Sequence, residues 1–116
     1  MNHERVYAMP FSSVYPLLVK KVERKGRTRA EVDAAVCWLT GYDQAGLEAQ
    51  IERGVDYATF FREAPTPNPH ADKITGVICG HRVEDIEEPL MRDIRRLDKL
   101  VDEIARGKAL DKVLRS

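Results

Sequence analysis

The sequence TRAEVDAAVCWLTGY, residues 28–42, decides the fold, because it combines two helix-end signals with six consecutive apolar residues. Thr28 and Glu31 have the spacing of a capping box, in which each side chain accepts a hydrogen bond from the backbone N–H of the other residue. Gly41 suits the left-handed conformation that commonly ends a helix. One face of the intervening helix is formed by Val32, Ala35, Val36 and Leu39. Because its second half is apolar nearly all round, the pattern predicts a core helix with Trp38 buried at the centre of the protein.

The totals describe one neutral domain of ordinary composition. The chain has 116 residues, 43% of them hydrophobic, with nineteen Lys and Arg against nineteen Asp and Glu. This length is typical of a single core, so residues 1–116 are expected to form one globular domain. A net charge of zero argues against a dedicated nucleic-acid binder, which usually carries a basic excess.

Two patterns missing from the sequence bear on location. No apolar run approaches the roughly eighteen residues that a membrane span needs. The N-terminus, MNHERVYAM, lacks the basic and then apolar layout of a secretion signal. A cytoplasmic protein without membrane contact is therefore expected, in which Cys37 and Cys79 remain free thiols.

Helices are predicted on both sides of the central one. Residues 5–11 are expected to be a short extended arm. A helix then begins at Ser12 or Ser13, with Pro16 in or beside its first turn, where a missing N–H does least harm. Gly26 ends this helix, and the short connection that follows predicts a steep or antiparallel hairpin of helices.

Further helices are predicted in the rest of the chain. Asp43 and Asp56 each precede a short apolar pattern and are expected N-caps. The last long helix starts at a capping box of Asp85 and Glu88, with Pro89 in its first turn. Its apolar seam consists of Leu90, Ile94, Leu97, Val101 and Ile104, and a short amphipathic tail follows.

Residues 74–80, ITGVICG, fit two structures. Their β-branched content suggests a strand, whereas the same apolar residues also fit one face of a helix. Asn68 followed by Pro69 is a helix-start signal, which favours the helix. The predicted fold is therefore all-α, a compact single domain of about six helices around the Trp38 helix, with a minor two-stranded β element as the alternative.

One candidate ligand pocket is defined by Tyr42, Cys79, His81 and Arg82. If residues 74–83 form a strand, Cys79 and His81 point to the same face as a thiol–imidazole pair, whereas in a helix they diverge. The ordinary alternative is a buried cysteine beside an exposed histidine. No HExxH or CxxC spacing occurs, so no metal and no cofactor are expected. Because glycine-rich phosphate loops and serine-nucleophile turns are also missing, no catalytic residue is assigned.

The stretch KKVERKGRTR, residues 20–29, holds six cations and one acid. Lys20, Lys21, Arg24, Lys25, Arg27 and Arg29 are therefore a candidate anion patch. The ordinary alternative is that cations at a helix C-terminus complement the helix dipole, and no aromatic residue interleaves with them to stack on bases. Nucleic acid is accordingly not an expected partner.

Four stretches carry a resemblance to a known family: VYPLLVKKVERKGRT (14–28), EVDAAVCWLTGY (31–42), ITGVICG (74–80) and RVEDIEEPLMRDIRRLDKLVDEIARGKALDKVLR (82–115). Over about residues 5–115 the chain resembles a bacterial family of small proteins catalogued as a domain of unknown function, family 2200. The resemblance implies a stand-alone bacterial cytosolic domain. It supplies no activity, substrate, cofactor or catalytic residue.

The sequence does not decide whether the chain is an enzyme. The expected function is a non-enzymatic binding or protein-interaction domain that self-associates as a homodimer. The dimer is expected through the C-terminal helices, because Met91 and Leu100 flank the apolar seam and need a second cover. The alternative is a small-molecule-binding protein or enzyme that uses the pocket defined above, and the sequence names no ligand for it.

Overall fold

The computed structural model describes residues 3–115. Within this range the chain forms seven α-helices, two short 3-10 helices (η1 and η2) and one antiparallel pair of strands. In chain order they are α1 (His3–Tyr7), α2 (Phe11–Glu23), α3 (Arg29–Thr40), α4 (Gln44–Arg53), α5 (Tyr57–Arg62), η1 (Ala71–Lys73), β1 (Val77–Ile78), β2 (His81–Arg82), η2 (Val83–Asp85), α6 (Pro89–Ala105) and α7 (Leu110–Val113). The prediction of a helical fold with a minor two-stranded element is confirmed.

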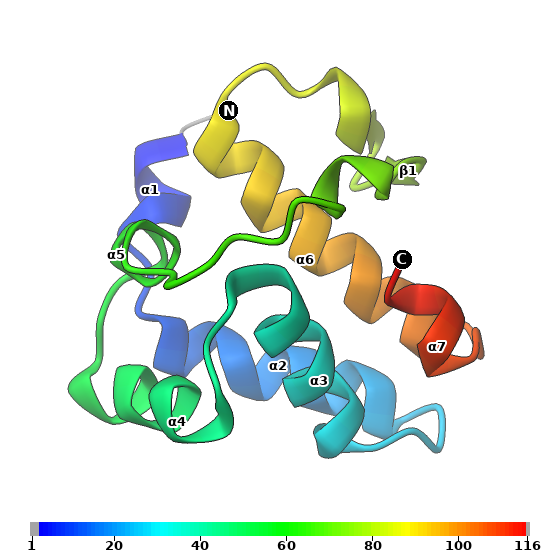
Figure 1. Cartoon of the computed structure of the whole chain (residues 1–116), viewed down its shortest axis with the longest axis horizontal. Helices are drawn as coiled ribbons and strands as arrows, with labels where there is room; N and C mark the ends of the chain where they lie inside the picture. The colour runs from blue at the N-terminus through cyan, green and yellow to red at the C-terminus, as the bar shows by residue number, and fades with distance from the viewer. Residues whose placement is uncertain (1–2, 116) are drawn as a thin grey trace.

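The longest helix, α6, crosses the middle of the fold and packs against α2, α3, α5, α7, β1 and η2 (Figure 1). Most of its predicted seam is covered within the chain: Leu90 is partly buried, whereas Ile94, Leu97, Val101 and Ile104, together with the neighbouring Leu100, are at most 1% exposed. The prediction that Met91 and Leu100 need a cover from outside is wrong, because neighbouring elements surround α6 and bury both side chains. The apolar surplus that favoured a dimer through α6 is therefore absent.

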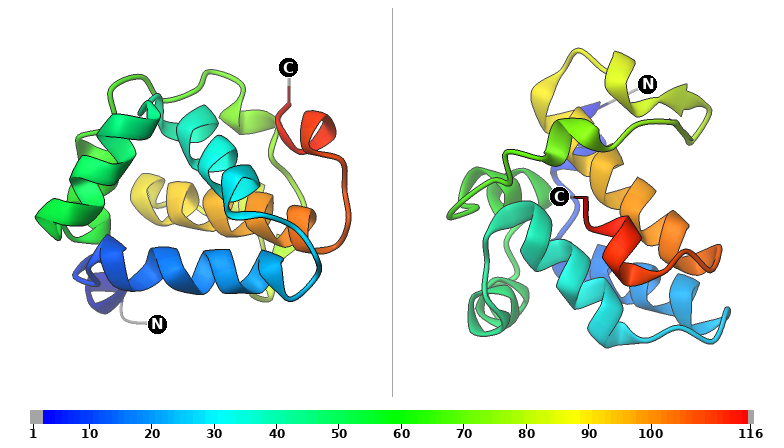
Figure 2. Two further views of the ribbon diagram at one scale, coloured as in Figure 1. Left: turned by 90° about the horizontal axis from the view of Figure 1, so that it is seen from below. Right: turned by 45° about the vertical axis from the view of Figure 1, so that its right-hand side comes forward.

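Helices α2 and α3 form a steeply crossed hairpin next to α6 (Figure 2). The predicted capping box at the start of α3 is confirmed, with Thr28 Oγ1 and Glu31 Oε1 each 3.3 Å from the backbone nitrogen of the other residue. The predicted inner face of α3 is buried. Trp38 differs from the prediction, because it is only partly buried and packs against the edge of the core. The reason is that α6, and not the second half of α3, is enclosed on several sides.

The proline loop at 65–70 closes the C-terminal end of α3. Its groups bind the last three carbonyls of that helix: Thr66 N–H to Thr40 O (3.1 Å), Asn68 N–H to Leu39 O (3.1 Å) and Asn68 Nδ2 to Trp38 O (3.0 Å). Gly41 ends α3 in the left-handed conformation (φ 83°), as predicted. The backbone of Thr66 lies so close that a Cβ at position 41 would be 2.6 Å from its N and O atoms.

The N-terminal segment is helical and not the predicted extended arm. Extended pairing is confined to the residues around Pro10, where the Phe11 N–H donates to Val55 O (2.9 Å). Helix α2 begins at Phe11, before the predicted start, so Pro16 lies in its second turn. Phe11 is fully buried and stacks on Phe60 of α5 with ring centroids 3.8 Å apart. This stack joins the start of α2 to α5.

Residues 74–80 do not form the favoured helix. Strands β1 and β2 pair as a hairpin in the register Val77↔Arg82 and Ile78↔His81. The two turn residues, Cys79 (φ 52°) and Gly80 (φ 81°), both have the positive φ that a two-residue hairpin turn of type I′ requires. The Asn68–Pro69 pair does not start a helix: the Asn68 side chain accepts a hydrogen bond from the His70 N–H (2.8 Å), and only the short η1 follows, with His70 as its N-cap.

Other predicted helix ends agree with the structure in most respects. Asp43 and Asp56 are the N-caps of α4 and α5. Pro89 is the first residue of α6, as predicted, but the N-cap is Glu88 and not Asp85, which ends η2. Within residues 3–115, no helix has the length and apolar content to cross a membrane.

Candidate functional site

A cavity of about 540 Å³ lies between the β1–β2 hairpin, η2 and α6, and we call it the hairpin cavity. It is lined by Gly80, His81 and Arg82 of the hairpin, by Asp85 and Ile86 after it, by Met91 and Arg95 of α6, and by His3 of α1. Met91 is buried and Ile86 is partly buried, whereas His81, Arg82 and Asp85 are exposed. Polar groups therefore surround an apolar part, an arrangement typical of small-molecule sites.

Hydrogen bonds at the base of the hairpin close it and attach it to α6. Three hydrogen bonds do this: Gly76 N–H to Glu84 Oε1 (3.0 Å), Val83 N–H to Gly76 O (2.9 Å) and Lys99 Nζ to Val77 O (3.2 Å). The hydrogen bond from Gly76 lowers the pKa of Glu84, so this carboxylate stays ionised at a lower pH than an ordinary glutamate does. At the tip, Arg95 Nη1 of α6 lies 3.5 Å from Cys79 Sγ.

Three of the four predicted pocket residues come together in this region. His81 and Arg82 line the hairpin cavity, and Cys79 lies at its edge through the contact with Arg95. Within residues 3–115 no hydrogen bond joins Cys79 to His81, so the thiol–imidazole pair is not formed. Tyr42 lies elsewhere, in a buried network with α4 and α5.

The Tyr42 hydroxyl donates to Phe60 O (2.7 Å) and accepts from Gln50 Nε2 (2.8 Å). Burial raises the pKa of Tyr42, with Gln50 opposing the shift. A phenol in this environment stays protonated and supports the packing of α4 and α5. Tyr42 therefore has a structural explanation that needs no ligand.

Sequence reasoning missed Met91, Arg95 and His3 as cavity residues. Met91 and Arg95 are four apart on one helix, so they share a face, and that spacing was a usable signal. Their contact with the hairpin is tertiary, and no local sequence pattern predicts it. His3 is brought in by α1, where an extended arm was expected.

The charges in the hairpin cavity are only partly neutralised. Arg95 pairs with Asp98 (2.9 Å), while Arg82 is 3.8 Å from Glu84 and its side chain is 63% exposed. Among residues 3–115, no group of three or more His, Cys, Asp or Glu is arranged to hold a metal ion. The cavity therefore offers guanidinium and imidazole groups for binding an anion.

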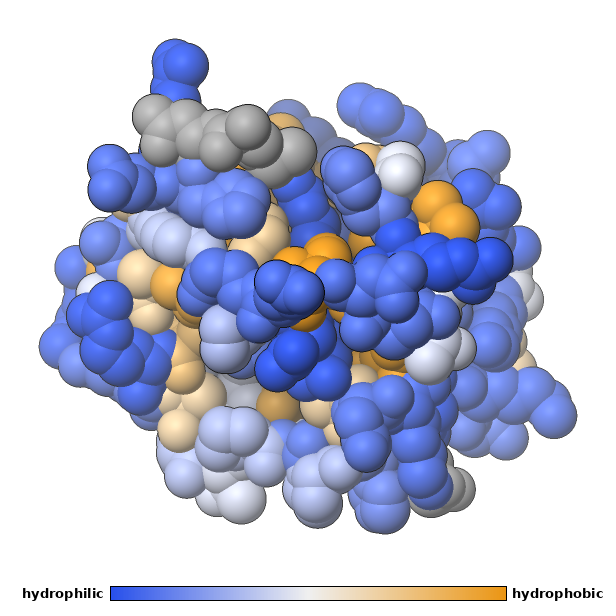
Figure 3. Space-filling model, turned by 90° about the horizontal axis from the view of Figure 1, so that it is seen from above, coloured by the Kyte–Doolittle hydropathy of each residue, from blue (hydrophilic) through white to orange (hydrophobic). Residues whose placement is uncertain are grey.

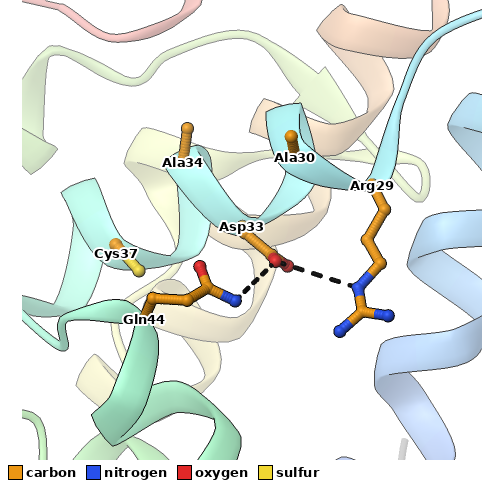
Figure 4. Close-up of a pocket in the computed structure, with 6 residues that line it drawn as sticks. All are labelled: Arg29, Ala30, Asp33, Ala34, Cys37 and Gln44. Carbon is orange, nitrogen blue, oxygen red and sulfur yellow. Dashed lines mark hydrogen bonds and ion pairs between the residues drawn. The ribbon is translucent and has the colours of Figure 1, made fainter.

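A second, more open hollow lies between α3 and α4 (Figure 4). At its centre Asp33 accepts a hydrogen bond from Gln44 Nε2 (2.9 Å) and another from the Tyr15 hydroxyl, and Arg29 Nε is 3.9 Å away. Burial, with Asp33 and Asp43 nearby, raises the pKa of Cys37, so that thiol is a poor nucleophile. The side chains of Tyr15, Asp33 and Gln44 bind one another and join α2, α3 and α4, which indicates a structural network.

The six cations of the predicted anion patch do not form one surface: two are bound within the fold, three line a groove and one lies outside both sets. Arg27 and Arg29 are hydrogen-bonded to groups of the surrounding helices. Lys21, Arg24 and Lys25 instead line a groove beside the C-terminal end of α6. Lys20 is exposed on α2, outside the lining of this groove.

The chain matches, over residues 5–115, the family described as "Uncharacterized protein conserved in bacteria (DUF2200)". Among solved structures it is similar to the crystal structure of uncharacterized protein SP1917, with a TM-score of 0.91 and 49% sequence identity over 96% of this chain and 91% of that chain. No curated protein matches the chain. Neither description assigns an activity. The chain belongs to the bacterial family DUF2200.

Proposed function

We propose that the chain is a binding domain for a small anionic molecule with an apolar part, and that the hairpin cavity is the binding site. The observation that carries this proposal is that Arg82 and Arg95 share one cavity with the apolar side chains of Ile86 and Met91. Apolar surface provides affinity, while a few charged groups orient the ligand. Guanidinium groups are suited to this because they bind carboxylate and phosphate oxygens through two parallel hydrogen bonds.

The size and charge of the cavity define the ligand further. Its volume of about 540 Å³ falls within the range of about 300–1,000 Å³ that holds small ligands. The lining holds two guanidinium groups and the carboxylate of Asp85, and each guanidinium also has a carboxylate partner outside the lining: Glu84 lies 3.8 Å from Arg82 and Asp98 lies 2.9 Å from Arg95. A single carboxylate or phosphate on a small apolar body therefore suits the site better than a highly charged molecule.

Phenyl phosphate and benzoate test this proposal, with benzyl alcohol as an uncharged probe of similar shape. Thermal unfolding and calorimetric titration should show that the two anions bind and stabilise the protein, and that benzyl alcohol does so much less. Arg82→Gln should remove most of the anion response. Arg62→Gln is the matched control, because Arg62 is an exposed arginine on α5 outside the cavity lining. Equal responses of the two variants, or no anion binding by the unaltered protein, would contradict the proposal.

Self-association as a homodimer is the second candidate. The observation that favours it is Leu17 on α2, a large apolar side chain that is 59% exposed. The C-terminal helices give it no support, since Met91 and Leu100 are buried. The face of the molecule seen from above relative to Figure 1 is largely hydrophilic, with small separate hydrophobic areas (Figure 3). Light scattering at micromolar concentration decides the matter: a dimer mass that Leu17→Glu converts to a monomer mass supports this candidate, and a monomer mass of the unaltered protein excludes it.

The proposed compartment is the cytoplasm. Support comes from Cys37 and Cys79, which are both free thiols in the described chain. Alkylation of the protein in unfolded form, directly after cell lysis under acid conditions, should label both cysteines. A disulfide-linked product at this step would argue for an oxidising compartment.

A further inference from the structure

The C-terminal ends of α2 and α6 border a groove of about 640 Å³, which we call the basic groove. It is lined by Lys21, Arg24, Lys25, Asp102, Ala105 and Arg106. Asp102 lies between two of the cations, with Oδ1 3.2 Å from Lys21 Nζ and Oδ2 2.9 Å from Arg106 Nε. One carboxylate thus holds a lysine of α2 beside an arginine at the end of α6.

The groove has a local positive excess in a chain that is neutral overall. Four cations line it against one carboxylate, and that carboxylate is already shared by Lys21 and Arg106. In the described range 3–115, Arg24 and Lys25 form no ion pair. Their charges are therefore available to a bound anion.

Cations at a helix C-terminus often serve only to bind the last carbonyl groups of the helix. Here the carbonyls of Lys20, Val22 and Glu23 in α2, and that of Ile104 in α6, have other partners. At the end of α2 the bonds are Arg24 N–H to Lys20 O (3.1 Å), Lys25 N–H to Val22 O (3.0 Å), Gly26 N–H to Glu23 O (3.0 Å) and Arg27 N–H to Val22 O (3.0 Å). At the end of α6, Arg27 Nη1 donates to Ile104 O (3.0 Å) and Lys108 O (2.8 Å). The fold therefore does not require the side chains of Arg24 and Lys25 as caps.

We propose that the basic groove binds a small molecule that carries two or more linked phosphate groups. A single ion pair in an open groove contributes little, because water and salt screen it. Linked phosphates engage several cations at once, so that Arg24, Lys25 and the pair held by Asp102 bind one ligand together. This site is separate from the hairpin cavity, where Arg82 and Arg95 already have carboxylate partners and therefore suit a ligand with one charged group.

The recognised chemistry is the phosphate chain and not a nucleic-acid strand. The lining side chains that the structure describes include no aromatic ring on which a base could stack. A strand would also need a longer basic surface than this groove, whereas the cations next to it, Arg27 and Arg29, are bound within the fold. The groove volume is close to that of sites that hold one small ligand.

Calorimetric titration with tripolyphosphate, pyrophosphate and phosphate at low ionic strength tests the proposal. Affinity should rise with the number of linked phosphates and fall as salt is added. The double variant Arg24→Gln with Lys25→Gln should bind tripolyphosphate at least about tenfold more weakly, because two charge-assisted contacts are lost. The matched control is Arg62→Gln with Lys112→Gln, which also removes one arginine and one lysine, from exposed sites on α5 and α7. Arg82→Gln should leave tripolyphosphate binding unchanged.

A second measurement needs no variant. In the unaltered protein, tripolyphosphate should shift the backbone amide NMR signals of residues 20–27 and 101–108 more than those of the hairpin. Largest shifts at the hairpin, equal loss in the two double variants, or no binding of tripolyphosphate each overturn the proposal. Binding of a short single-stranded oligonucleotide more tightly than tripolyphosphate, lost in the Arg24 and Lys25 double variant, would also overturn it and assign the groove to nucleic acid.

Discussion

The Tyr15 hydroxyl donates a hydrogen bond to Oδ1 of Asp33, and this bond joins α2 to α3 in the interior. Both residues are 7% exposed. Oδ2 of the same carboxylate accepts from Gln44 Nε2 of α4 (2.9 Å), and Arg29 Nε donates to the Tyr15 oxygen (2.8 Å). One buried carboxylate thus fixes three helices, and it is acceptable in the interior only because these donors are present.

Tyr15→Phe should destabilise the protein by about 1–3 kcal/mol, because Asp33 then loses a donor while it remains buried. Urea unfolding at neutral pH measures this. Tyr7→Phe is the control, since Tyr7 also donates to a carboxylate, that of Glu88, but at an exposed position. It should cost less than about 1 kcal/mol. Similar losses in the two variants would show that burial of the Tyr15–Asp33 bond contributes nothing extra.

The same bond predicts how stability changes in alkali. Burial, and then the hydrogen bond to Asp33, raises the pKa of Tyr15 from 10.0 to about 12. The associated stability is complete below pH 10 and is lost as the pH rises through the folded-state pKa, because the unfolded chain releases the proton first. Unfolding between pH 9 and pH 12 should therefore show a smaller decline for Tyr15→Phe than for the unaltered protein. An identical decline would show that Tyr15 has an ordinary pKa.

The ion pair of Arg27 with Glu31 predicts a loss of stability in acid, where the Tyr15 bond predicts one in alkali. The Arg27 guanidinium binds the Glu31 carboxylate, the Ile104 carbonyl in the last turn of α6 and the Lys108 carbonyl just after that helix. The hydrogen bond from Arg27 lowers the pKa of Glu31 from its ordinary 4.5, so that contribution is present above pH 4.5 and is lost as the pH falls through the lower folded-state value. Arg27→Lys keeps the charge but loses the bidentate geometry. It should lower the urea midpoint at pH 7 and flatten the loss of stability below pH 4.5, while Lys112→Gln should change neither.

Local signals made the helix ends predictable. The cap and the N–H groups that it binds lie within three residues, as at Thr28 with Glu31 and at Asp43 and Asp56. Such pairs are decided by backbone geometry near one point of the chain and do not depend on the rest of the fold. Periodicity likewise identified the buried seam of α6, because burial follows the helical repeat.

Tertiary contacts were not predictable in the same way. Trp38 was expected at the centre because its own stretch is the most apolar, yet burial depends on which helix the others surround. Lys21 and Arg106 belong to one groove only because Asp102 holds them together across two helices. The hairpin at 77–82 was predicted only as the alternative to a helix, because short apolar runs fit both periods, and positive φ at a non-glycine residue, Cys79, has no sequence signature.

The strained turn predicts a stabilising substitution. Cys79 has φ 52°, a conformation that is unfavourable for most side chains but tolerated by asparagine. Cys79→Asn produces the Asn-Gly pair preferred in this type of hairpin turn and should stabilise the protein by about 0.5–1 kcal/mol. Cys79→Ala removes the thiol and keeps the strain, so it should give no gain. Thermal unfolding of the three proteins measures this, and an equal gain from alanine would assign the effect to the thiol.

Two glycines that end helices in the same conformation differ in their surroundings, and this gives a matched test of close packing. Gly41 has φ 83° and Gly54 has φ 69°, so alanine is strained at either position, by about 1–2 kcal/mol. A Cβ at Gly54 meets no heavy atom of the described residues within 4 Å, whereas one at Gly41 would lie 2.6 Å from the N and O atoms of Thr66. Backbone cannot yield there without breaking the hydrogen bond from Thr66 N–H to Thr40 O (3.1 Å), which closes α3.

Gly41→Ala should therefore cost at least about 1–3 kcal/mol more than Gly54→Ala, the difference being the cost of forcing the proline loop away from α3. Urea unfolding gives both free energies. Hydrogen exchange gives the mechanism, because only Gly41→Ala should lose protection at the amides of Thr66 and Asn68, whose partners are the last carbonyls of α3. Equal costs for the two variants would mean that the loop moves aside freely, and the capping of α3 by residues 65–70 would then contribute little to stability.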